Sequence, residues 1–209
     1  ASSATEQDLL TRLGVAGTLP QLDREDGGDG LALTFNNAAG NKIDYYLAAD
    51  ATYDVTADAR TNTAVAELEL TLTNNGPTEG EPPYVISNLI GLPDGSNRTW
   101  VSIFSRLPVT EVRLDGQPVA AEVGAEAGYF VTSVFVTLGP GESASLDLSM
   151  SGRLDAAEGY DLAVRAPPTV EPTPIRVEAT WIDPDQATHR SSIDVEQPGL
   201  ARLRVDADD

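Results

Sequence analysis

The chain has 209 residues, of which 41% are hydrophobic and 22% are charged, as in a globular protein that can bury a core. Its 13 basic and 33 acidic residues give a net charge of −20, so nucleic acids and anionic membrane surfaces would repel it at long range. The absence of cysteine excludes disulfides and thiolate sites. No apolar run approaches the roughly 20 residues of a membrane-spanning helix. We therefore expect no nucleic-acid partner and no membrane contact by this segment.

Residues 1–30 divide into a short helix and a linker. Thr5 can cap a helix of roughly ten residues, and Gly14 permits a left-handed exit at its end. Residues 23–30 are acidic and glycine-rich, without apolar side chains to hold them against a core. We expect a solvated linker there, followed by one folded domain at 31–209.

From Leu31 onward, apolar and polar residues alternate with a period of two, which is typical of strands with one buried and one solvated face. The clearest alternation lies in residues 64–72, 144–150, 175–181 and 201–205. Asp115 and Gly116 form a two-residue turn sequence that favours an antiparallel hairpin. Many short strands with turn residues between them predict an all-β fold, an antiparallel two-layer β-sandwich of the immunoglobulin-like kind. A closed barrel is the alternative.

A proline-rich stretch at residues 167–174 precedes the last strands. Proline favours extended backbone, so this stretch could act as a stiff linker. The residues after it are too few to hold an independent core without disulfides or a metal. We assign them to the main sandwich, with 168–209 as a candidate peripheral hairpin.

Residues that could carry catalysis or bind a metal are sparse. His189 is the only imidazole and lies in a polar stretch, so we expect it to be solvated rather than catalytic. The many acids could supply a carboxylate pair for glycoside hydrolysis, but in a chain of charge −20 an acidic, solvated coat is the better interpretation. Four acids, including Asp29, lie within residues 23–30, although their spacing does not fit an EF-hand. Calcium binding there stays open; otherwise we expect no metal, no cofactor and no catalytic residue.

Aromatic side chains could form a stacking platform for sugar rings if several faced outward together. Trp181 continues the apolar side of its strand, which favours burial. Trp100 lies beside Val101 and Ile103 and could point to either face of its strand. Trp100 is therefore our first candidate ligand-binding residue.

Several short stretches resemble one bacterial protein family. The most specific is Asn-Lys-Ile-Asp-Tyr-Tyr-Leu at residues 41–47. Further matching stretches are residues 6–10, 52–55 and 92–99. On these stretches, from about Thr5 to Pro168, the chain resembles the C-terminal part of domain-of-unknown-function family four-zero-one-two. Its members are uncharacterised envelope proteins of high-GC Gram-positive bacteria, so the resemblance implies an extracytoplasmic location and a membrane anchor upstream, with no known activity.

Lys42 and Tyr45 are two further candidate ligand-binding residues. Lys42 is the only lysine of the chain, and both residues lie inside the most family-like stretch. The alternative for Lys42 is an ion pair with Asp44, which at the surface would contribute at most about 1 kcal/mol.

The sequence is compatible with three hypotheses about function. The first is a non-catalytic extracytoplasmic interaction or scaffold domain of a cell-envelope protein, with a protein or a cell-wall glycan as partner. The second is a glycan-binding module for cell-wall or capsular polysaccharide, which requires an exposed aromatic platform. The third is a carboxylate-driven hydrolase, which requires a cleft with two acids of separated pKa values. We favour the first.

Overall fold

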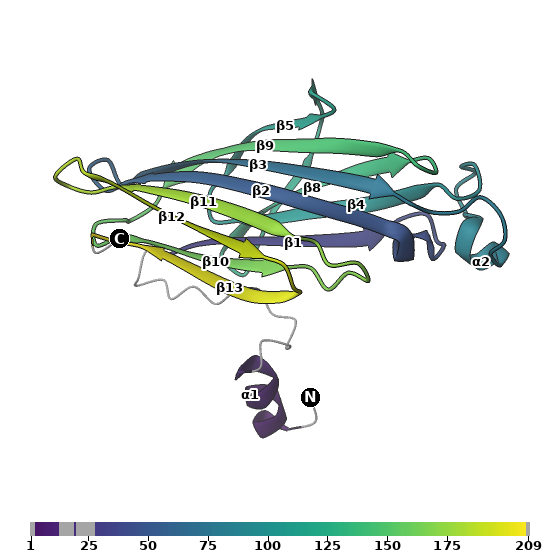
Figure 1. Ribbon diagram of the computed structural model, residues 1–209, viewed down its shortest axis with the longest axis horizontal. Coiled ribbons are helices and arrows are strands. Elements are labelled where there is room, and N and C mark those ends of the chain that lie inside the picture. The colour runs from purple at the N-terminus through teal and green to yellow at the C-terminus, as the bar shows by residue number, and fades with distance from the viewer. Residues whose placement is uncertain (1–2, 13–18, 20–27, 208–209) are drawn as a thin grey trace.

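The computed structural model describes residues 3–12, 19 and 28–207, and these form a two-layer β-sandwich with a short N-terminal helix (Figure 1). The all-β prediction is confirmed, and the two sheets are separate rather than one closed barrel. The helical elements are α1 (Ala4–Arg12), the 3-10 turn η1 (Ile43–Tyr46) and α2 (Pro83–Ile86). The strands are β1 (Asp29–Asn37), β2 (Leu47–Asp58), β3 (Thr63–Asn74), β4 (Asn97–Ser105), β5 (Val109–Leu114), β6 (Gln117–Pro118), β7 (Glu122–Glu126), β8 (Tyr129–Leu138), β9 (Ser143–Arg153), β10 (Tyr160–Ala166), β11 (Ile175–Ile182), β12 (Thr188–Val195) and β13 (Gly199–Val205).

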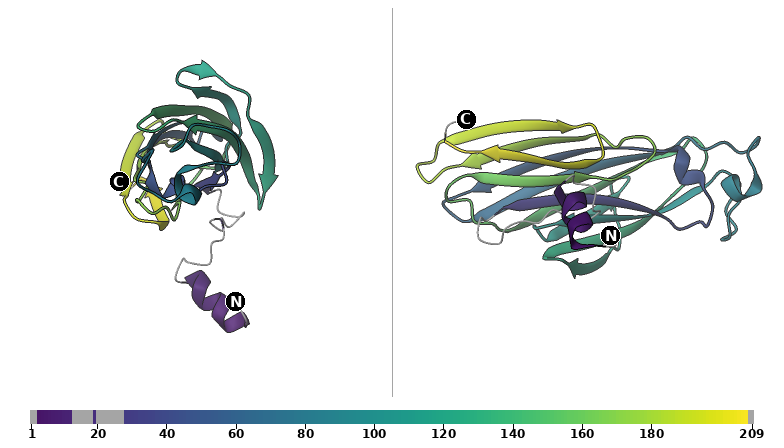
Figure 2. Two further views of the ribbon diagram at one scale, coloured as in Figure 1. Left: turned by 90° about the vertical axis from the view of Figure 1, so that its right-hand side faces the viewer. Right: turned by 90° about the horizontal axis from the view of Figure 1, so that it is seen from below.

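The two layers face each other across the core (Figure 2). Sheet A has the order β13-β10-β1-β4-β8-β7, and sheet B has the order β12-β11-β2-β3-β9-β5-β6. Neighbouring strands pair antiparallel, as predicted, except that β1 pairs with β10 and β2 with β11 in parallel. Strands β12 and β13 belong to different sheets but lie beside each other, so they close one lateral side of the sandwich.

The core forms because alternating apolar residues of both sheets point inward. On β3 and β9, Leu68 lies opposite Leu148 and Leu70 opposite Leu146, and all four are fully buried. The intervening residues, such as Glu67, point to solvent. The alternation predicted from the sequence is therefore the alternation of the two faces of each sheet.

The folded domain begins earlier than the predicted boundary at residue 31. Gly28 and Gly30 are buried, and Asp29 opens β1 and is 0% exposed. The strands within residues 168–209 belong to the two sheets of the sandwich. Strand β11 lies between β12 and β2 inside sheet B, and β13 pairs with β10 in sheet A, so the last strands extend both layers.

The N-terminal helix is present, with a different cap. The hydroxyl of Ser3 accepts a hydrogen bond from the backbone N–H of Glu6 at 3.2 Å, so Ser3 rather than Thr5 caps α1. The predicted end at Gly14 lies outside the described residues. Figure 1 and the left view of Figure 2 show α1 standing apart from the two sheets.

The turns give the sandwich two different ends. The predicted turn at Asp115 and Gly116 is confirmed, with φ values of 50° and 74°. The end of the sandwich that carries η1 and α2 is called the α2 end. At the opposite end, the β2–β3 and β11–β12 turns lie side by side, because β2 and β11 are parallel neighbours. This end is called the hairpin end.

Candidate functional site

Two aromatic rings and one guanidinium stack on the outer face of sheet A. Trp100 on β4 lies opposite Phe135 on β8, and their ring centroids are 4.2 Å apart at an interplanar angle of 53°. The guanidinium carbon of Arg98 lies 4.3 Å from the Phe135 ring centroid, within range of a cation–π contact. Val101 and Ile103 face the core with 0% exposure, so their neighbours on β4 point outward. Arg98, Trp100 and Phe135 together are called the Trp100 platform.

The platform keeps unused binding capacity. Phe135 is 44% exposed and Trp100 is half-buried. Arg98 forms no ion pair with a carboxylate of the described residues, and its buried Nε has no hydrogen-bond partner there. Four of the other arginines, Arg60, Arg113, Arg176 and Arg204, each pair with a carboxylate. The platform therefore offers an aromatic surface and a guanidinium that pairs with no carboxylate of the described residues.

Lys42 and Tyr45 lie elsewhere, in the loop between β1 and β2 at the α2 end. Lys42 is exposed and forms no ion pair within the described part of the chain, so the proposed pair with Asp44 is absent. Tyr45 is 59% exposed and meets the ring of Tyr46 edge-on at 5.1 Å. Within residues 28–207, no hydrogen bond, ion pair or ring contact joins either residue to Trp100. The structure thus brings two of the three candidates into one loop and separates them from the third.

The family-like stretch around these residues has a structural role. The side-chain amide of Asn37 donates to Asn41 and to Asp44, each at 2.9 Å, and its carbonyl oxygen accepts from two backbone N–H groups. Asn41 in turn donates to the backbone of Ser96 at 3.3 Å, and the N–H of Lys42 donates to Val85. These bonds fasten the β1–β2 loop to the segment that carries α2. The polar residues of this stretch therefore hold the loop in place, and their hydrogen bonds do not point to a ligand.

At the hairpin end, His189 is not a solvated residue as predicted. It lies on β12 opposite Trp181, with ring centroids 5.1 Å apart, and its Nε2 is 3.2 Å from Oδ2 of Asp183. Trp181 is buried as expected and donates its indole N–H to Ala156 at 2.8 Å. Burial raises the pKa of Asp183, but hydrogen bonds from His189 and from the backbone, including the N–H of Ala187, outweigh it and lower the pKa. His189 therefore braces the β11–β12 turn.

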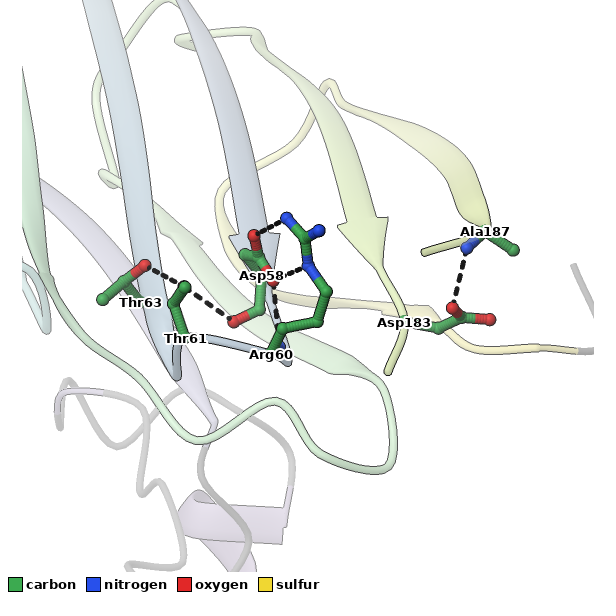
Figure 3. A network of polar contacts seen from close by, with 6 residues as sticks. All are labelled: Asp58, Arg60, Thr61, Thr63, Asp183 and Ala187. Atoms are coloured by element: carbon green, nitrogen blue, oxygen red, sulfur yellow. Dashed lines mark hydrogen bonds and ion pairs between the residues drawn. The ribbon is translucent and has the colours of Figure 1, made fainter. Parts of the chain in front are cut away.

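A second carboxylate organises the neighbouring turn (Figure 3). Asp58 accepts bonds from Nε and Nη2 of Arg60 at 2.9 and 2.6 Å, and from the Arg60 N–H at 2.9 Å. The side-chain hydrogen bond from Arg60 lowers the pKa of Asp58 to about 2. Asp183 in the adjacent turn accepts from the N–H of Ala187 at 2.8 Å, and Ala59 donates to Ile182 between the two turns. The acids at this end thus hold turns together.

The most unusual group is a carboxyl inside the core. The hydroxyls of Tyr160 and Tyr53 donate to Oδ2 of Asp29 at 2.9 and 3.2 Å, and the N–H of Gly30 donates to Oδ1 at 2.7 Å. Tyr53 belongs to sheet B, whereas Asp29 and Tyr160 belong to sheet A, so the cluster links the two layers. Burial raises the pKa of Asp29 and carries the pKa of both tyrosines well above 10. Asp29 is 0% exposed, so this raised-pKa acid lies in the core and does not face solvent.

Sequence reasoning missed this cluster and misplaced Asp29 in a calcium-binding or linker stretch. Residues 23–27 of that stretch lie outside the described residues. Within the part that the structure describes, no three His, Asp or Glu side chains are grouped to hold a metal ion. One signal was available: Asp29 lies two positions before Leu31, so it continues the two-residue period of Leu31 and Leu33 and falls on the same face of the strand.

No helix among the described residues is long and apolar enough to cross a membrane. No protein-family model and no curated protein matches the chain. Among solved structures, a putative nutrient binding protein from Legionella pneumophila gives a TM-score of 0.38 at 8% identity, over 66% of this chain and 54% of that one. Leukotriene A4 hydrolase from Saccharomyces cerevisiae gives 0.40 at 9% identity, over 76% and 29%. An M1 zinc metallopeptidase from Deinococcus radiodurans gives 0.30 at 12% identity, over 77% and 38%. The chain thus spans 29 to 54% of these proteins, and likenesses this weak carry no argument about function.

Proposed function

We propose that the protein is a non-catalytic interaction domain of a cell-envelope protein and that the Trp100 platform is its binding surface. The observation that carries this proposal is the stack of Arg98, Phe135 and Trp100, with an exposed ring and a guanidinium that pairs with no carboxylate of the described residues. Tryptophan and arginine dominate the binding energy of protein interfaces, where they anchor into pockets of the partner. An envelope protein is accordingly the first partner class, and the extracytoplasmic location rests on the family resemblance of residues 41–47.

The second candidate function is binding of a cell-wall or capsular glycan. It is supported by the same rings, because a sugar ring can stack on Trp100 or Phe135 while neighbouring polar groups bind its hydroxyls. Asn36, exposed and opposite Trp100 in the strand pairing, and Thr137, exposed on β8, supply such groups.

The two candidates separate in a binding experiment with immobilised domain. An envelope protein fraction and purified cell-wall polysaccharide are applied separately to the wild type, to Trp100→Ala and to the control Tyr84→Ala. Tyr84 is 70% exposed and lies outside the platform. We expect Trp100→Ala to weaken binding by at least tenfold, as for an interface anchor, and Tyr84→Ala to leave it unchanged.

If the immobilised domain retains a protein from the envelope fraction but no polysaccharide, the interaction domain is supported. If it retains the polysaccharide, the glycan module is supported. If Trp100→Ala binds as tightly as the wild type, the platform is not the binding surface and both candidates fail. Surface exposure on intact cells, tested with added protease, checks the extracytoplasmic location.

A further inference from the structure

Strand β7 (Glu122–Glu126) forms an exposed edge of sheet A. It pairs with β8 on one side and ends the order of strands in the sheet on the other. All five of its residues are exposed, and Val123 is 80% exposed. An open edge is a template for a further strand, and natural proteins usually cover or disrupt such edges unless they use them.

The β7–β8 turn fixes which backbone groups face the open edge. Ala127 and Gly128 form a two-residue loop with φ values of 50° and 87°, and Glu126 pairs with Tyr129 across it. The residues that flank such a loop form a hydrogen-bonded pair, and hydrogen-bonded and non-hydrogen-bonded pairs alternate along an antiparallel ladder. Val123 and Ala125 therefore direct their N–H and C=O groups away from β8, where an added strand would bind.

The side chains of β7 separate into an apolar and an acidic face. Val123 and Ala125 lie opposite Thr132 and Phe130 of β8, and Thr132 in turn lies opposite the buried Ile103. These residues therefore point to the inner side of sheet A, where Phe130 remains 46% exposed. The two glutamates of β7 point to the outer side. A strand that adds here meets apolar surface on one face and two carboxylates on the other.

We propose that β7 binds an extended segment of another protein by strand addition, and that this segment alternates apolar residues with lysine or arginine. Its apolar residues would pack beside Val123 and Phe130, and its cations would lie beside Glu122 and Glu126. Main-chain hydrogen bonds supply affinity in this mode of recognition, and alternate side chains supply specificity. The net charge of −20 attracts such a basic segment at long range.

A second copy of the chain fits this edge poorly. Antiparallel pairing of two β7 strands over their full length would place Glu122 directly opposite Glu126 of the second copy, twice. Like charges directly opposite each other on paired strands are destabilising. Charge therefore selects a basic partner strand over self-association.

The test uses a synthetic octapeptide in which lysine and valine alternate, with a glutamate–valine octapeptide as its counterpart. We expect the lysine peptide to bind saturably and to slow amide hydrogen exchange at Val123 and Ala125. Val123→Pro removes only an N–H that faces the open edge, a position that tolerates proline, so the β7–β8 pairing should survive. We expect this variant to lose at least tenfold in affinity, and Ala125→Pro provides the same test should the first variant not fold.

Charge variants separate the strand site from unspecific attraction to an acidic protein. The double substitution Glu122→Lys with Glu126→Lys should abolish binding of the lysine peptide. The matched double substitution Glu69→Lys with Glu178→Lys changes net charge equally on exposed positions of sheet B and should leave binding intact. Trp100→Ala should also leave it intact, so failure here and failure of the Trp100 platform are distinguishable. The proposal is overturned if the peptide does not bind, if the proline variants bind it normally, or if both charge variants weaken it equally.

Discussion

Tyr160→Phe removes a single hydroxyl from the core and leaves the ring in place. That hydroxyl donates to Oδ2 of Asp29 at 2.9 Å, and Tyr53 donates to the same oxygen at 3.2 Å. Asp29 and Tyr53 are 0% exposed and Tyr160 is 1% exposed, so solvent does not reach the position of the lost hydroxyl. The substitution therefore deprives a buried carboxyl of one of its three hydrogen bonds, while the packing of the two sheets is preserved.

The expected loss follows from what that bond contributes. A neutral hydrogen bond contributes about 1 kcal/mol, and one to a charged group about 1.5–3 kcal/mol. Tyr160→Phe should therefore lower the free energy of unfolding by about 1–3 kcal/mol. In a domain of this size, 1 kcal/mol corresponds to a fall in Tm of about 2–4 °C.

Urea unfolding followed by fluorescence measures this difference directly. Tyr84→Phe is the matched control, because it deletes the same atom from a residue that is 70% exposed and should change stability by less than about 0.5 kcal/mol. The reasoning is refuted if Tyr160→Phe and Tyr84→Phe unfold at the same urea concentration. It is also refuted if Tyr160→Phe alters the m-value, since the change would then not be local.

Two further substitutions test the core and the α2 end. Burial raises the pKa of Asp29 above its ordinary 3.8. The protonated carboxyl therefore stabilises the fold below pH 3.8, and this contribution is lost as the pH rises through the raised pKa. The stability of Asp29→Asn should fall less steeply with rising pH than that of the wild type, and parallel curves would contradict this. Gly95 has φ +81°, and a Cβ there would lie 2.6 Å from the carbonyl oxygen of Pro77, whereas Gly116 has φ +74° with open space around it. Gly95→Ala should thus destabilise by more than the roughly 1 kcal/mol expected of Gly116→Ala in thermal melts, and equal effects would show that the contact relaxes freely.

The sequence predicts well those elements whose conformation is determined by residues that are neighbours in the chain. Leu68 and Leu70 alternate with glutamates because one face of β3 is buried, and that period is visible without coordinates. The turn at Asp115 is predicted for the same reason, since its backbone conformation depends on the two residues that adopt it. The parallel pairing of β2 with β11 could not be predicted, because more than a hundred residues separate the two strands and no local pattern encodes it.

The polar clusters were misjudged for the same reason. Asp29 lies beside acidic and glycine-rich residues in sequence, which suggested solvent, but its partners Tyr53 and Tyr160 are 24 and 131 positions away. His189 is a milder case, since the hairpin register that places it opposite Trp181 could have been extended from the turn between them. Hydrogen-bonding residues are therefore interpreted reliably only after the strand pairing is known.

The position of the family-like stretch bears on where binding can occur. Asn41 and Asp44 are engaged by Asn37, and Asn74 donates to three backbone carbonyls of the same end, so these polar groups are committed to holding loops. A ligand that took their hydrogen bonds would have to open the α2 end. The outer face and the free edge of sheet A require no such rearrangement. Among the described residues, Arg98 pairs with no carboxylate, and β7 has a strand on one side only. The loop residues that hold the α2 end and the surfaces proposed here for partners thus lie on different parts of this sandwich.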